Sequence, residues 1–174
     1  MAPEERTEIV QELERSRQEL LAALSGMDEA QAKARPDAER WSVLECVEHI
    51  TIVEEYFFAQ LEKAEKLDAP RINKEHEARL MAGFPDRSTR RQAPEMVRPS
   101  GRFATLAEAL VHFNTRRERS IQFAQDRAGD LYYLTSEHPR FGTVNGVEWL
   151  IFIAGHGRRH TAQIQEIRAG LQAI

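Results

Sequence analysis

Apolar residues recur at spacings of three and four along most of the chain, a period typical of amphipathic helices. Four long segments carry this pattern, namely Pro3–Ser25, Ser42–Lys66, Thr105–Ala128 and Asn145–Ala169. Two shorter helices are predicted over Asp28–Ala34 and Asn73–Ala82. No segment alternates apolar and polar residues over enough positions to predict a strand. The pattern therefore predicts an all-α fold, a four-helix bundle about 30 Å long.

Capping boxes mark the starts of three of the long helices. In this motif a Ser, Thr or Asn side chain accepts the amide N–H three residues ahead, and a Glu at that position reaches back. The pairs are Ser42 and Glu45, Thr105 and Glu108, and Asn145 and Glu148. Trp41 precedes the first pair, at the position of a hydrophobic staple. These signals place the helix starts independently of the apolar pattern.

Two long connections join the helices, Leu67–Ala104 and Gly129–Val144. Long loops are uncommon in compact domains and often cover a functional site. The first carries Arg90, Arg91 and Arg98, which could close over an anionic substrate. The simpler interpretation, which we favour, is a solvated basic loop.

Composition narrows the function classes. A chain of 174 residues with 41% hydrophobic and 30% charged residues is expected to form one domain, residues 1–174. Its net charge of −4 argues against nucleic acid as a partner. The only cysteine, Cys46, excludes an internal disulfide and a cysteine-based zinc cluster, and we expect a core thiol. With a charged N-terminus and no long apolar run, we expect no signal peptide, no membrane contact and a cytoplasmic location.

The most informative feature is the pair His156 and His160. Residues four apart lie on one helical face, about 6 Å apart, close enough to bind one metal ion. Here the face is apolar, because the two histidines continue the line of Trp149, Ile153 and Ile164. Buried imidazoles need polar partners, and a shared metal ion satisfies both at once. The competing interpretation is that each ring bonds to a core carbonyl or carboxylate.

His49, near the edge of the apolar face of the second long helix, is the third candidate ligand. Three neutral imidazoles with an open coordination position suit zinc, nickel, iron or a related divalent ion. Glu45, one turn earlier, is expected to orient the His49 ring. His138 lies in a loop that could reach the site, whereas His76 and His112 are expected to be solvated.

Sharper metal motifs are absent. The zincin pattern requires Glu directly after the first histidine of the pair, and this chain has Gly157 there. The di-iron bundle pattern requires Glu three residues before a histidine, and no histidine of the chain meets this condition. The candidate is therefore a mononuclear three-histidine site.

Two stretches of the chain resemble the signatures of the DinB-like (DinB/YfiT) superfamily. The first is Arg40–Ile50, and the second is His138–Gly142 followed by Trp149–Ile164. The resemblance covers nearly the whole chain. Its specificity lies in the order of parts, one histidine on the second long helix and then His-x-x-x-His on the last.

The resemblance implies a four-helix bundle in which His49, His156 and His160 bind a divalent metal ion. Nickel and zinc are the metals we expect most, and iron and manganese are the less expected alternatives. It also implies a homodimer and a small-molecule substrate such as a low-molecular-weight thiol. The implied activity is that of a thiol S-transferase or a hydrolase. From the residues themselves, we take Glu45 and His138 as the candidates for a catalytic base. The alternative is a non-catalytic, metal-stabilised bundle that acts as a structural or interaction module.

Overall fold

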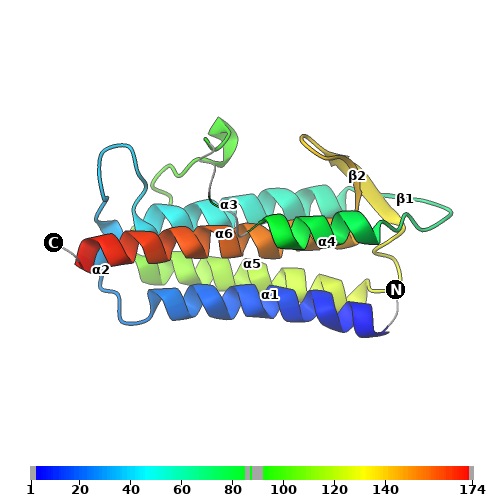
Figure 1. Cartoon of the computed structure of the whole chain (residues 1–174), viewed down its shortest axis with the longest axis horizontal. Coiled ribbons are helices and arrows are strands. Elements are labelled where there is room, and N and C mark those ends of the chain that lie inside the picture. Colours follow the sequence, from blue (N-terminus) through cyan, green and yellow to red (C-terminus); the bar gives the residue numbers. More distant parts are fainter. Residues whose placement is uncertain (1–2, 85–86, 88–91, 173–174) are drawn as a thin grey trace.

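The computed structural model describes residues 3–84, 87 and 92–172, and its long helices form a four-helix bundle (Figure 1). The long helices are α1 (Pro3–Leu24), α3 (Val43–Glu62), α5 (Leu106–Asp126) and α6 (Gly146–Gln172). Both α1 and α3 pack against α5 and α6. No helix within the described residues combines the length and apolar character that a membrane crossing requires. The predicted all-α bundle is confirmed.

Shorter elements complete the fold at the sides of the bundle. They are α2 (Glu29–Lys33), α4 (Lys74–Gly83) and the 3-10 turn η1 (Glu95–Val97). Helix α4 packs along α6 (Figure 1), and η1 packs against α3. Both belong to the long connection between α3 and α5, which is therefore folded onto the two helices that carry the candidate histidines.

The capping boxes predicted from the sequence start α3 and α6. The Ser42 hydroxyl accepts the Glu45 amide at 3.2 Å, and the Glu45 carboxylate accepts the Ser42 amide at 2.8 Å. At α6 the side chains and amides of Asn145 and Glu148 are paired in the same way, at 2.9 and 2.7 Å. At α5 only half of the box forms, because the glutamate bonds to the amide before the cap. These caps satisfy the first amides of each helix.

A small antiparallel sheet lies at one end of the bundle, where the sequence predicted no strand. Its strands, in the order β1-β2-β3, are β1 (Glu65–Lys66), β2 (Leu134–His138) and β3 (Gly142–Asn145). Thr135 pairs with Glu65 on one side and with Asn145 on the other. Strands this short do not repeat the alternating pattern often enough to reveal themselves. The β2–β3 hairpin places His138 and its neighbours beside α6.

Two apolar clusters form the core, and a buried polar group lies where they meet. One cluster contains Leu13 and the other Phe113. The fully buried Arg117 bonds to the Leu13 carbonyl at 2.9 Å, and its guanidinium lies 5.2 Å from the centre of the Phe113 ring. Glu54 on α3 and Ser16 on α1 bond to the same guanidinium at 3.0 and 2.9 Å. Every side-chain polar atom of the buried pair Arg117 and Glu54 therefore has a hydrogen-bond partner, as burial requires.

Candidate metal centre

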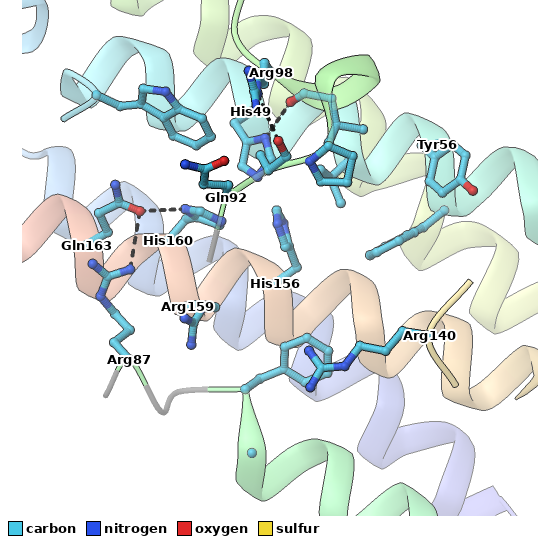
Figure 2. Close-up of a pocket in the computed structure, with 18 of the residues that line it drawn as sticks. His49, Tyr56, Arg87, Gln92, Arg98, Arg140, His156, Arg159, His160 and Gln163 are labelled. Carbon is cyan, nitrogen blue, oxygen red and sulfur yellow. Dashed lines mark hydrogen bonds between the residues drawn. The ribbon is translucent and has the colours of Figure 1, made fainter. Parts of the chain in front are cut away.

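Three histidines converge between α3 and α6. His49 comes from α3 and is 3% exposed, and His156 and His160 come from α6 (Figure 2). The potential ligand nitrogens of the three rings all lie within 4.8 Å of one another. Among the described residues no further His, Cys, Asp or Glu joins this group. One ion bound by all three rings would keep a coordination position open.

Helix α1 packs closely against α6 at Gly157, the residue after His156. A Cβ atom at Gly157 would lie 2.7 Å from the Ser16 hydroxyl oxygen and 3.3 Å from Arg117 Nη2. The glycine therefore allows α1 and the buried arginine to pack closely against α6, at a position that follows His156 in the sequence but faces the core and not the pocket. This explains physically why a zincin glutamate has no room at this position.

Hydrogen bonds to the back of two rings fix which nitrogen faces the centre. The Nδ1 of His49 lies 2.6 Å from the Val97 carbonyl oxygen. The Nδ1 of His160 lies 2.9 Å from Gln163 Oε1, which also accepts a hydrogen bond from Arg87 at 3.3 Å. A carbonyl oxygen can only accept, so Nδ1 carries the proton in both rings. The Nε2 lone pairs are left as metal ligands.

Burial keeps the three rings neutral. Desolvation lowers the pKa of His49, although its bond to Val97 opposes the shift. Burial lowers the pKa of His160 to about 3, with a further contribution from the nearby His49. The pKa of His156 falls well below its ordinary value, first through burial and then through the charges of the neighbouring histidines and arginines. Neutral imidazole is the form that binds metal ions.

The triad opens onto a pocket of about 1250 Å³. Aromatic side chains form part of its wall, with Trp41 4.7 Å from the His49 ring and Phe57 6.1 Å from the His156 ring, centre to centre. Six arginines but only two glutamates line it over the described residues. A site of this kind combines apolar area with a few directed polar groups, as ligand pockets do.

Glu45 does not orient His49 as expected. Its carboxylate accepts the amide of Ser42 and pairs with Arg35, and it does not line the pocket. The capping bond points the carboxylate toward the start of α3 and away from the ring one turn later. The Val97 carbonyl orients His49 instead.

His138 lies on the wall of the same pocket, outside the group of three ligands. Its ring centre is 4.6 Å from that of Phe152 and 5.2 Å from that of Trp149. Burial lowers its pKa to about 4. Because its Nδ1 accepts the Arg140 amide at 3.1 Å, the proton of the neutral ring is on Nε2.

The predictions for the other histidines and for the loop arginines are confirmed only in part. His112 is exposed as expected, but His76 is not solvated, because its half-buried ring contacts the fully buried carboxylate of Glu148. Arg90 and Arg91 lie outside the described residues. Arg98 lines the pocket, and its Nε donates to the Ala93 carbonyl at 2.9 Å.

The buried Cys46 thiol is a core group, as expected. Its side chain packs within the apolar cluster that contains Phe113. Burial raises its pKa to about 12, so it stays protonated and is not a nucleophile at neutral pH.

Sequence reasoning missed the groups that support the ligands. Gln163 had a detectable signal, because it lies three residues after His160 on the same helical face. Val97 had none, because a backbone carbonyl leaves no trace in residue type. The buried Glu48 had none either, because the partners of its carboxylate, the amides of Ser100 at 2.6 Å and Arg102 at 3.2 Å, lie far along the chain. Glu48 thereby fixes the segment that follows Val97 against α3.

Comparisons with known proteins agree with this architecture. YuaE of Bacillus subtilis (strain 168), described as an uncharacterized protein, is 26% identical over 149 residues, which cover 86% of this chain and 90% of YuaE. The crystal structure of TT2238, a four-helix bundle protein, has a TM-score of 0.57 at 24% identity and covers 92% of this chain and 98% of that one.

A second solved structure extends the comparison. YfiT from Bacillus subtilis, described as a probable metal-dependent hydrolase with an unusual four-helix bundle topology, has a TM-score of 0.63 at 15% identity, covering 99% of this chain and 90% of YfiT. These two likenesses show the fold. The model of the DinB superfamily matches residues 12–164. The chain belongs to the DinB superfamily.

Proposed function

We propose that this protein is a metal-dependent enzyme whose divalent ion is bound by Nε2 of His49, His156 and His160. The observation that carries the proposal is the convergence of three inward-facing imidazoles within 4.8 Å at the wall of a large pocket. Among the described residues no fourth protein ligand closes the site, which favours catalysis over a purely structural role. Three imidazole donors favour nickel or zinc as the bound metal, with iron or manganese as the less favoured alternatives.

The donor chemistry fits such an ion. Two rings have Nδ1 occupied by oxygen acceptors, and burial keeps all three neutral. When bound, a divalent ion supplies a Lewis acid that favours the deprotonated form of water or of a thiol. The chain's own groups hold the rings in place, and the aromatic wall excludes bulk water from one side of the site.

Hydrolysis is the reaction class that we place first, because YfiT, a structural neighbour, is described as a probable metal-dependent hydrolase. Thiol S-transfer is the second candidate. The pocket of about 1250 Å³ favours it, since this volume exceeds the roughly 300–1,000 Å³ usual for one small ligand and leaves room for a thiol and its acceptor. The small-molecule substrate, the homodimer and the cytoplasmic location remain predictions.

Metal analysis of untagged protein tests the metal site. We expect wild-type protein to bind one equivalent of zinc or nickel and the variant His156→Ala/His160→Ala to bind none tightly. His112→Ala is the matched control, because this histidine is exposed and lies outside the pocket. Equal metal content in wild type and double variant would refute the metal site.

Activity measurements separate the reaction classes. Metal-loaded protein is assayed with a panel of esters and amides, and with thiols paired with electrophilic acceptors. Turnover that requires the metal and is lost in the double variant supports the enzyme. Tight metal binding without turnover in either assay, together with a lowered melting temperature after metal removal, would favour the non-catalytic, metal-stabilised bundle.

A further inference from the structure

A second polar region lies along the same pocket, at a distance from the histidine triad. It consists of His76 and Arg79 on α4 and of Arg140 and Phe141 in the β2–β3 turn, all of which line the pocket. We call these residues the distal face. The ring centres of His76 and Phe141 are 6.0 Å apart, and the Arg140 guanidinium lies 5.3 Å from the centre of the Phe141 ring. The two elements thus meet around Phe141.

The core holds the His76 ring in one orientation. Its Nδ1 contacts the Glu148 carboxylate, which is fully buried. The other oxygen of this carboxylate accepts the Asn145 amide at 2.7 Å and Arg71 Nη1 at 3.2 Å. Because Glu148 is the partner of Asn145 in the capping box of α6, it cannot move without disrupting the helix start. Nε2 of His76 is therefore the ring nitrogen left for a ligand.

The arginines of the distal face have little competition from acidic groups. Within the described part of the chain, no carboxylate pairs with Arg140, whose side chain extends toward the centre of the pocket in Figure 2. Arg79 has one contact of 3.6 Å with Glu75, and both side chains are exposed. Such a pair is weak and is readily exchanged for a ligand. Guanidinium groups bind carboxylates and phosphates through paired N–H bonds.

Glu148, which bonds to His76, gives the separation of the far end of the distal face from the triad. Glu148 and His156 lie eight residues apart on α6. At 1.5 Å per residue this separation is about 12 Å along the helix. Phe57 and Phe84 line the pocket along this path. Both rings pack on the buried Phe152, which lies midway between Glu148 and His156 on α6, with ring centres 6.0 and 5.7 Å away.

We infer that the pocket binds an extended anionic substrate, with its reacting group at the histidine triad and a terminal oxyanion, such as a carboxylate, at the distal face. This inference rests on the proposed metal site and names the substrate class that the site selects. Arg140 and Arg79 bind the oxyanion, and His76 Nε2 contacts the substrate next to it. The aromatic path accepts an apolar middle section.

Cobalt-loaded protein tests the inference without a catalytic assay. A thiolate that binds Co²⁺ changes the visible absorption of the ion, so each thiol can be titrated. The probes are ω-mercaptoalkanoates and ω-mercaptoalcohols of equal length, short and long. The long members have about ten carbons, since bonds of about 1.5 Å in an extended zigzag then span roughly 12 Å.

We expect the long carboxylate to bind at least roughly 10-fold more tightly than the long alcohol, as a charge-assisted bond predicts. The short pair should differ little. Arg79→Gln/Arg140→Gln should remove most of the preference while cobalt content and the affinity for the alcohols stay unchanged. Arg15→Gln, an exposed arginine on α1 outside the pocket, should keep the preference.

Each contrary result has one meaning. If long carboxylate and long alcohol bind equally well, or if the arginine variant keeps the preference, the distal face is not the anion site. If no thiol changes the cobalt spectrum although cobalt is bound by the triad, the open coordination position of the proposed function is refuted, and the inference with it. If Arg15→Gln also loses the preference, general electrostatic attraction explains it and the inference is overturned.

Discussion

His49 Nδ1 lies 2.6 Å from the carbonyl oxygen of Val97, 48 residues further along the chain. This bond fixes the proton of His49 on Nδ1 and turns Nε2 toward His156 and His160. The carbonyl is itself held in place, because Glu48, next to His49 on α3, accepts the amides of the segment that follows η1. One turn of α3 therefore carries both a candidate ligand and the anchor of the group that orients it.

Glu48→Ala is expected to weaken zinc binding about 10-fold or more, because the Val97 carbonyl loses its support and His49 its fixed orientation. Affinity is measured by competition with a chromophoric chelator, and circular dichroism checks that the helices remain. Glu62→Ala is the control, since it removes a glutamate of α3 that pairs with Arg119 on the surface. Unchanged zinc affinity in a folded Glu48→Ala protein would contradict this role.

The hydrogen bond at Nδ1 of His160 leads to a similar prediction. Gln163→Met removes the acceptor of the His160 Nδ1 proton, and metal affinity should fall about 10–100-fold. Gln163→Glu keeps an acceptor oxygen and should retain most of the affinity. Gln165→Met, on the exposed side of the same helix, should have no effect. A loss of affinity that is equal in Met and Glu variants would show that the hydrogen bond is not responsible.

The sequence was sufficient for those parts of the site that depend on helical geometry. The spacing of His156 and His160 and the apolar line through them predicted that the pair faces inward, and the structure confirms this position. The cap of α3, which begins at Ser42, sets the register that brings His49 to the same place. Local bonds determine each of these features.

Features that depend on pairing between distant segments were not predictable in this way. The Val97 carbonyl contacts His49 only because the long connection folds back over α3. His76 lies among charged neighbours in the sequence, which indicated a solvated ring, yet α4 packs on α6 and brings it to Glu148. A residue's own neighbours in sequence carry no information about such a partner.

Gly157 is predicted to be required for the packing of α1 on α6. Gly157→Ala places a methyl group 2.7 Å from the Ser16 hydroxyl oxygen, and we expect a loss of about 1–3 kcal/mol in the free energy of unfolding. Chemical denaturation of metal-free protein measures this change. Gly170→Ala is the control, because among the described residues no atom outside its own stretch of helix lies within 4 Å of the added Cβ, and a helical alanine should be neutral or stabilising by up to about 1 kcal/mol. Equal stability of the two variants would refute the packing argument.

The buried histidines predict how the stability of the metal-free protein depends on pH. Burial lowers the folded-state pKa of His49, His156 and His160, to about 3 for His160, whereas each has a pKa near 6.5 in the unfolded chain. Below about pH 6.5 the unfolded chain therefore binds more protons than the folded one, and unfolding becomes easier as pH falls. Each fully neutral ring contributes a slope of up to about 1.4 kcal/mol per pH unit.

Urea denaturation between about pH 5 and 7, in the presence of a chelator, isolates this effect, because most carboxylates titrate below this range. His160→Gln should reduce the slope of unfolding free energy against pH by the contribution of one histidine. His112→Gln changes an exposed position and should leave this slope unchanged. Stability that is independent of pH in this window would mean that the three rings accept protons in the folded protein. The triad would then be a solvated cluster that binds metal weakly at neutral pH, contrary to the burial on which the metal site depends.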